Sequence, residues 1–118
     1  MKIVIIGSTR YQDKFNAVAN RLRSEGHDVR IPAFDYHPDL DELGVCEYNR
    51  RLIEHADRVH VVWDQRSLGT VFDFGMVFAL RKPFVIEYME PKTFRGVMEK
   101  YAAGEGRGGE GYCWKPIG

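Results

Sequence analysis

The sequence predicts an α/β fold in which one parallel β-sheet is covered by helices on both faces. Segments 2–6 and 58–63 are almost continuous runs of β-branched and other apolar residues, as expected for strands buried on both sides. Segments with the apolar spacing of helices alternate with the strand segments along the chain. At 118 residues, the chain fits a single domain that buries a core without disulfides or metals.

Each element has its own signal. The first helix buries a stripe that repeats every three or four residues (Phe15, Val18, Ala19, Leu22), and Gly26 is placed to end it. The second strand is weaker, and a loop rich in Asp and Pro at 33–44 precedes a helix with Tyr48, Leu52 and Ile53 on its inner face. Arg81-Lys82-Pro83 ends the third helix, because Pro cannot continue it. The expected elements, in order, are a strand at 2–6, a helix at 12–25, a strand at 27–32, a helix at 45–55, a strand at 58–63, a helix from Gly69 or Thr70 to Leu80, a strand at 84–87 and a helix at 91–103.

Right-handed crossovers place these strands in the order 2-1-3-4, a doubly wound, flavodoxin-like or Rossmann-like three-layer sandwich. Ligands in such sheets bind beyond the carboxyl ends of the strands where the strand order reverses, here between the first and third strands. The loops at 7–10 and 64–69 leave those two strands, so we expect them to form the site. Residues 1–103 make up the predicted domain, and residues 104–118 combine a glycine-rich linker with an aromatic tail. The tail is the candidate for a fifth strand of the sheet.

Charge and cysteine content limit the kinds of partner. The chain has 17 Lys and Arg against 17 Asp and Glu, so its formal net charge is zero. A neutral chain is poorly suited to nucleic acid polymers or anionic membrane surfaces, and no apolar run approaches the about 20 residues that span a bilayer. Cys46, Cys113 and the four histidines lack metal-site spacing, so we expect no metal, no cofactor and a reducing, cytoplasmic location.

The loop after the first strand, Gly7-Ser8-Thr9-Arg10, has the composition of a site for one anion. It offers a glycine for close approach, two hydroxyls and a guanidinium, just before a helix N-terminus that favours negative charge. The alternative is that Ser8 and Thr9 cap the helix and Arg10 is solvated. The sequence has no GxGxxG or GxxxxGK[ST] motif, so dinucleotide and P-loop sites are not indicated.

The segment Ser67–Gly75 supplies a second helix N-terminus and a carboxylate, Asp73. Phe72 and Phe74 flank Asp73 with apolar bulk that would desolvate it, so a nucleophile beside an anion pocket is one interpretation. The other is helix capping, because Thr70 and Asp73 have the spacing of a capping box.

Other polar residues carry weaker signals. Nothing local distinguishes Asn49 from a solvated residue on a helix surface, and His60 in a buried strand is expected to be a hydrogen-bonded interior histidine. Asp35, Tyr36 and His37 follow the second strand, so they are candidates for contact with a ligand on the basis of their position alone.

Three stretches give the sequence a resemblance to a known family. They are Gly7-Ser8-Thr9-Arg10, IEHADRVHVVWD at 53–64 and, most specific of the three, SLGTVFDFGMVFALRKP at 67–83. Over residues 1–90 the chain resembles the nucleoside 2-deoxyribosyltransferase superfamily, and most closely its deoxynucleoside 5′-monophosphate N-glycosidase branch. In that family a carboxylate attacks the anomeric carbon of the nucleoside, and water or a second base resolves the glycosyl-enzyme.

The resemblance implies a role for each matching residue. Asp73 corresponds to the nucleophile, which is normally Glu and thus one methylene longer, and Asn49 corresponds to a second acid that assists proton transfer. An amide cannot exchange a proton as an acid does, so Asp35 or Asp64 is an alternative source of a carboxylate. The family also implies a homodimer in which the partner's C-terminal region completes each site. The expected substrate-binding residues, which hold a 5′-phosphate, are Gly7, Ser8, Arg10, Ser67 and Gly69.

The leading interpretation is therefore an enzyme that hydrolyses or transfers the N-glycosidic bond of a (deoxy)nucleoside 5′-monophosphate, with aromatic residues stacked on the base. An alternative from a different class is a nucleotide-binding or sensor protein of the same fold without the chemistry, motivated by Asn49 and the shorter Asp73. A phosphoacceptor or flavin-binding protein of the same topology is less favoured, because the first strand does not end in an acidic cluster.

Overall fold

The computed structural model describes residues 1–90 and 95–104, where strands and helices alternate as predicted. The elements, in chain order, are β1 (Lys2–Gly7), η1 (Thr9–Tyr11), α1 (Gln12–Ser24), β2 (Asp28–Arg30), η2 (Pro32–Phe34), α2 (Glu42–His55), β3 (Arg58–Trp63), α3 (Leu68–Ala79), β4 (Phe84–Met89) and α4 (Arg95–Ala103). The linker and tail beyond residue 104, with Cys113 and the expected fifth strand, lie outside the described residues. Among the residues described, no helix has both the length and the apolar character needed to cross a membrane.

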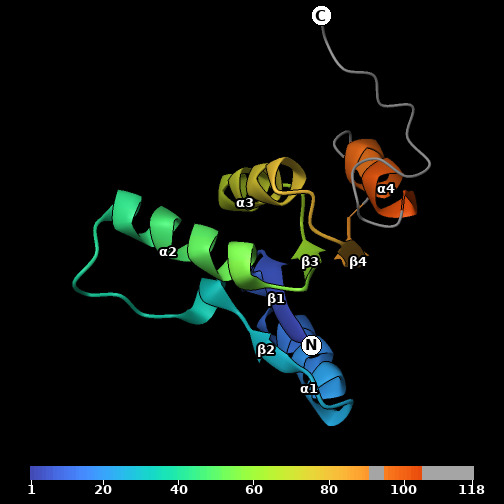
Figure 1. The fold of residues 1–118 in the computed structure, drawn as a ribbon, viewed down its shortest axis with the longest axis horizontal. Helices are drawn as coiled ribbons and strands as arrows, with labels where there is room; N and C mark the ends of the chain where they lie inside the picture. Colours follow the sequence, from blue (N-terminus) through green and yellow to red (C-terminus); the bar gives the residue numbers. More distant parts are fainter. Residues whose placement is uncertain (91–94, 105–118) are drawn as a thin grey trace, which may run out of the picture.

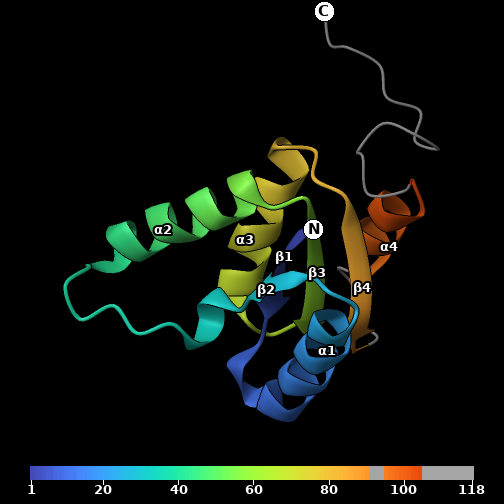
Figure 2. The ribbon, with the colours of Figure 1, turned by 60° about the horizontal axis from the view of Figure 1, so that its bottom comes forward.

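The four strands are all parallel and lie in the order β2-β1-β3-β4, which confirms the predicted topology. β1 and β3 form the centre of the sheet, paired from Ile3 with Arg58 to Gly7 with Val62. Helices α2 and α3 cover one face and α1 covers the other, as Figures 1 and 2 show from two directions. α4 packs beside β4 on the α3 face, so the protein has the expected three layers.

Side chains of the central strands alternate between two apolar cores, which is why their sequences read as continuous apolar runs. In β1, Val4 and Ile6 face the α2–α3 layer, whereas Ile3 and Ile5 face α1. The larger core joins β3, α3, β4 and α4 through Trp63, Phe74, Val77, Phe84 and Tyr101. The smaller core packs Phe15, Ala19 and Leu22 of α1 against the sheet, as the stripe in the sequence predicted.

The structure corrects several predicted boundaries. α2 begins at Glu42, inside the expected loop, because Asp41 caps it: the Asp41 Oδ1 atom accepts a hydrogen bond from the Gly44 N–H at 2.7 Å. β2 is shorter than predicted, whereas β4 runs on to Met89 through a bulge at Glu87. α3 begins at Leu68 with Ser67 as its N-cap residue, slightly earlier than expected.

Gly7 brings the ends of the two central strands close together. Its φ angle is +151°, and a Cβ atom there would lie 1.7 Å from the carbonyl oxygen of Val62. The next residue continues the contact, since the Ser8 N–H donates to the same Val62 oxygen at 2.9 Å. A side chain at position 7 would therefore separate the two loops that leave β1 and β3.

Candidate functional site

Ser8 and Asp64 join the loops that follow β1 and β3. The Ser8 hydroxyl donates to Asp64 Oδ1 at 2.7 Å, and the Asp64 backbone N–H donates to Ser8 Oγ at 3.1 Å. Both residues are buried, with 3% and 5% of their surface exposed. The two loops predicted to form the site thus meet at the carboxyl ends of the strands, where the strand order reverses.

Asp64 also orders the loop that leads into α3. Its Oδ1 atom accepts hydrogen bonds from the backbone N–H groups of Arg66 at 2.8 Å and Ser67 at 3.1 Å. Burial acts to raise the pKa of the Asp64 carboxyl, but the N–H group of Arg66, the Ser8 hydroxyl, the N–H group of Ser67 and the Arg10 charge together hold that pKa below its usual range. Asp64 is therefore an ionised, structurally fixed carboxylate.

A cavity of about 290 Å³ opens between the two loops. Arg10 borders it with a half-exposed guanidinium, whose Nη1 atom lies 3.6 Å from Asp64 Oδ2. The structure thus brings together four of the five predicted substrate-binding residues, and it adds Asp64, which sequence reasoning named only as a substitute carboxylate. The lining residues are Gly7, Ser8, Thr9, Arg10, Asp64, Arg66 and Ser67.

The fifth predicted residue, Gly69, lies in the first turn of α3, just beyond the cavity lining. A Cβ atom at this position would meet Ser67 Oγ at 3.9 Å as its nearest described neighbour, so the backbone is open to close approach. Ser67 makes no side-chain capping bond, although its Oγ accepts from Thr70 Oγ1 at 3.2 Å. The first N–H groups of α3 are therefore not capped by Ser67.

Asp73 lies in the second turn of α3, so the predicted capping box with Thr70 is wrong: the helix already begins at Leu68. The Asp73 side chain is partly buried, and burial raises its pKa to about 6, while a hydrogen bond from Asn49 acts in the opposite direction. An ionised carboxylate only accepts hydrogen bonds, so the Asn49 amide group must be the donor.

Asn49 therefore has a defined place, which local sequence did not reveal. It lies on α2, which packs beside α3 (Figure 1), and its side chain is partly buried rather than solvated. Its Oδ1 atom is buried and has no hydrogen-bond partner among the described residues. The structure thus brings Asn49 and Asp73 together, although neither lines the cavity.

Two of the three residues that were expected from their position to touch a ligand, Asp35 and His37, form a cluster with Tyr48, the residue before Asn49. The Tyr48 hydroxyl donates to Asp35 Oδ2 at 3.3 Å, and the rings of His37 and Tyr48 lie 4.2 Å apart. Tyr36, the third of these residues, is 85% exposed. Asp35 and His37 therefore contact α2 at Tyr48, next to Asn49 in the sequence, whereas Tyr36 is not part of this cluster.

His60 is an interior histidine, as predicted, on the α1 face of the sheet. Arg58 Nε donates to its Nε2 atom at 2.9 Å, so the proton of the neutral ring lies on Nδ1, which donates to Glu87 Oε1 at 2.9 Å. Burial lowers the pKa of His60 despite the neighbouring Glu87 carboxylate. This network stabilises the pairing of β3 with β4 and takes no part in the site.

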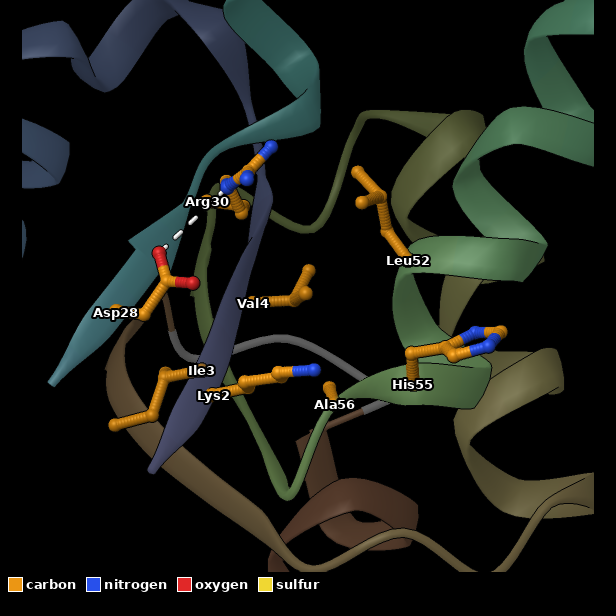
Figure 3. Close-up of a pocket in the computed structure, with 8 residues that line it drawn as sticks. All are labelled: Lys2, Ile3, Val4, Asp28, Arg30, Leu52, His55 and Ala56. Atoms are coloured by element: carbon orange, nitrogen blue, oxygen red, sulfur yellow. Dashed lines mark ion pairs between the residues drawn. The ribbon is translucent and has the colours of Figure 1, made fainter.

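A second cavity, of about 300 Å³, lies at the other end of the sheet, near the starts of β1 and β2. Figure 3 shows Val4 on β1 and Leu52 on α2 on opposite sides of this cavity, and a dashed line marks the Asp28–Arg30 ion pair on β2. The Arg30 Nε atom lies 3.6 Å from Asp28 Oδ1. It lies away from the carboxyl ends of the strands, where such sheets bind ligands. We therefore assign no site to it. Its lining residues are Lys2, Ile3, Val4, Asp28, Arg30, Leu52, His55 and Ala56.

Comparison with known proteins finds a solved structure with a similar fold. No family model matches the chain, and no curated protein matches it. Among solved structures, the CMP N-glycosidase BcmB of Clostridium botulinum matches with a TM-score of 0.56 and 14% sequence identity, over 81% of this chain and 80% of that chain. The resemblance predicted from the sequence is thus confirmed for the fold: the chain is similar in fold to a nucleotide N-glycosidase.

Proposed function

We propose that the protein is an N-glycosidase or deoxyribosyltransferase that acts on a (deoxy)nucleoside 5′-monophosphate, with Asp73 as the nucleophile. One observation carries this proposal: a partly buried carboxylate with a pKa of about 6, hydrogen-bonded by Asn49, lies on the helix whose N-terminus borders the cavity. At neutral pH such a group is ionised yet poorly solvated, which suits attack on carbon. The likeness to a CMP N-glycosidase supports the same reaction class.

The reaction proceeds in two displacements. An oxygen of Asp73 bonds to the anomeric carbon, and the bond from that carbon to the base breaks; the base leaves with the electron pair and takes up a proton from water. Water, or a second base, then attacks the same carbon and releases Asp73, so the configuration is retained. Asn49 cannot supply the proton, so we assign it a positioning role through its hydrogen bond to Asp73.

The cavity is the proposed place for the 5′-phosphate. The Arg10 guanidinium, the Ser67 hydroxyl and the first N–H groups of α3 supply positive charge and donors, and Gly69 leaves the backbone open. Replacing Arg10 with Gln should weaken binding of cytidine 5′-monophosphate on the order of tenfold, as measured by calorimetry. The matched control is Arg51→Gln on α2, an exposed arginine that does not line the cavity.

A homodimer is also proposed, and the surface of α3 supports it. Asp73 is the single charged residue between Leu68 and Ala79, yet Leu68, Phe72 and Phe78 are 83%, 57% and 51% exposed. Sedimentation should show a dimer that Phe78→Glu shifts toward monomer, whereas Tyr36→Glu, at another exposed aromatic residue, leaves it unchanged. A wild-type protein that sediments as a monomer at every concentration would contradict this proposal.

Base release tests the proposed activity. The protein is incubated with each ribonucleoside and deoxyribonucleoside 5′-monophosphate, and free base is separated by chromatography. We expect release from at least one substrate, and its loss in Asp73→Asn but not in Asp13→Asn, which removes the same charge from the exposed start of α1. Release that survives Asp73→Asn would exclude Asp73 as the nucleophile.

A second candidate function is a nucleotide-binding protein of the same fold without catalysis. The observation that favours it is the amide of Asn49 beside the carboxylate, where the chemistry gains from an acid. Calorimetry separates the two proposals, since this one expects tight binding of a nucleotide without base release.

A further inference from the structure

We propose that Asp64 determines how the cavity discriminates between a 5′-phosphate and a free 5′-hydroxyl. Its carboxylate opposes the phosphate and accepts a hydrogen bond from the hydroxyl, so the protein takes the free nucleoside as well as the monophosphate. This inference rests on the proposed function and refines its substrate class. Asp64 is then a specificity-determining residue in addition to a loop-ordering one.

The two oxygens of Asp64 have different surroundings. Oδ1 accepts all three hydrogen bonds given above, from the Ser8 hydroxyl and from the N–H groups of Arg66 and Ser67. Oδ2 faces the Arg10 guanidinium, at 3.6 Å from Nη1. Three donors that a phosphate would use are therefore already engaged with a carboxylate, while Oδ2 keeps capacity to accept a further hydrogen bond.

The charges around the cavity lead to the same conclusion. Arg10 and Arg66 contribute positive charge to its lining, and Asp64 contributes a buried negative charge. A phosphate carries a charge between −1.5 and −2 near pH 7, so it competes with Asp64 for Arg10 and is repelled by Oδ2. A 5′-hydroxyl is uncharged and donates one hydrogen bond, so it gains a partner at Oδ2 without that repulsion.

Asp64→Asn separates the charge from the loop geometry. The amide keeps an oxygen at the Oδ1 position to accept from Ser8, Arg66 and Ser67, while an NH2 group, a donor to phosphate, replaces Oδ2. The matched control is Asp28→Asn, which removes one exposed carboxylate at the start of β2, at the opposite end of the sheet. Asp64→Ser provides a second uncharged variant, used if Asp64→Asn fails to show cooperative thermal unfolding.

The experiment is a calorimetric titration of the wild type and the variants with inorganic phosphate, cytidine 5′-monophosphate and cytidine at pH 7.5. We expect Asp64→Asn to tighten binding of phosphate and of the monophosphate by on the order of tenfold, with cytidine bound no more tightly than before. Asp28→Asn should leave all three affinities unchanged.

Binding of phosphate and of the monophosphate that is unchanged, weaker or undetectable in the uncharged variants would overturn the proposal. Because the readout is binding, its failure is distinct from failure of the proposed function. A protein that releases no base but shows the expected change in phosphate affinity contradicts the role of Asp73 and retains that of Asp64.

Discussion

The side chain of Asn49, on α2, hydrogen-bonds the partly buried carboxylate of Asp73, on α3. Burial raises the pKa of Asp73 to about 6, and the Asn49 amide limits that rise by stabilising the ionised form. The relationship joins two helices on one face of the sheet, beside the loops that meet at Ser8 and Asp64. The proposed activity therefore depends on the protonation state of Asp73.

Base release should fall as the pH drops below about 6, because protonated Asp73 is not a nucleophile. Well below this pH, the logarithm of the rate should fall by about one for each pH unit, as for a single ionisation. Initial rates between pH 4.5 and 8 check this. A rate that stays constant down to pH 4.5 would mean that another group carries the reaction.

Asn49→Leu should move the midpoint of that pH profile upward. Leucine fills a similar volume but donates no hydrogen bond, so the ionised form of Asp73 loses its stabilising partner and its pKa rises. The rate at pH 6 should therefore fall more than the rate at pH 8. Asn16→Leu, at an exposed position on α1, is the matched control. An equal loss of rate at both pH values in Asn49→Leu would show that Asn49 does not act through the pKa of Asp73.

Asp73→Asn should stabilise the fold at pH 7.5, even as it removes the activity. The pKa of Asp73 rises from 3.8 to about 6 on folding, so the ionised carboxylate opposes folding above about pH 6. Below pH 3.8 the group is protonated in both states and this penalty disappears. We expect a gain in the free energy of unfolding of about 1–3 kcal/mol at pH 7.5, which shrinks toward pH 4. Urea unfolding at both pH values measures it, and a loss of stability at pH 7.5 would contradict the pKa assignment.

The two phenylalanines beside Asp73 should differ sharply in how much their replacement by alanine lowers the free energy of unfolding. Phe74 is buried among Phe84 and Tyr101, whereas Phe72 is 57% exposed. Phe74→Ala should lower the free energy of unfolding by about 3–5 kcal/mol, because it leaves a cavity in the larger core. Phe72→Ala should change it by less than about 0.5 kcal/mol at concentrations where the protein is monomeric. Similar losses in both variants would show that α3 packs differently.

The architecture followed from the sequence because its signals are local. Ile3 to Ile6 read as a run because the strand is buried on both faces, and Gly26 ends α1 through its positive φ angle of 92°. The start of α2 was missed because it depends on one bond between the side chain of Asp41 and the backbone of Gly44, within a segment whose acidic residues also suit a loop.

The site was less predictable because its contacts span the chain. Ser8 and Asp64 are 56 positions apart, so the hydrogen bond that fixes the Asp64 carboxylate beside the cavity was visible only once β1 and β3 were placed side by side. Asn49 resembles a surface residue until α2 packs against α3. Residue type and position therefore indicated where the site lies, whereas the partners of each side chain required the tertiary structure.

The proposed role of Asp73 is tested most directly by trapping the glycosyl-enzyme. The protein is mixed with a substrate that releases base, the reaction is quenched with acid within one turnover, and intact protein and peptides are weighed by mass spectrometry. We predict an added mass equal to the sugar phosphate, on the peptide that contains Asp73, and no such adduct in Asp73→Asn. An adduct on a different carboxylate, such as Asp35 or Asp64, would contradict the account.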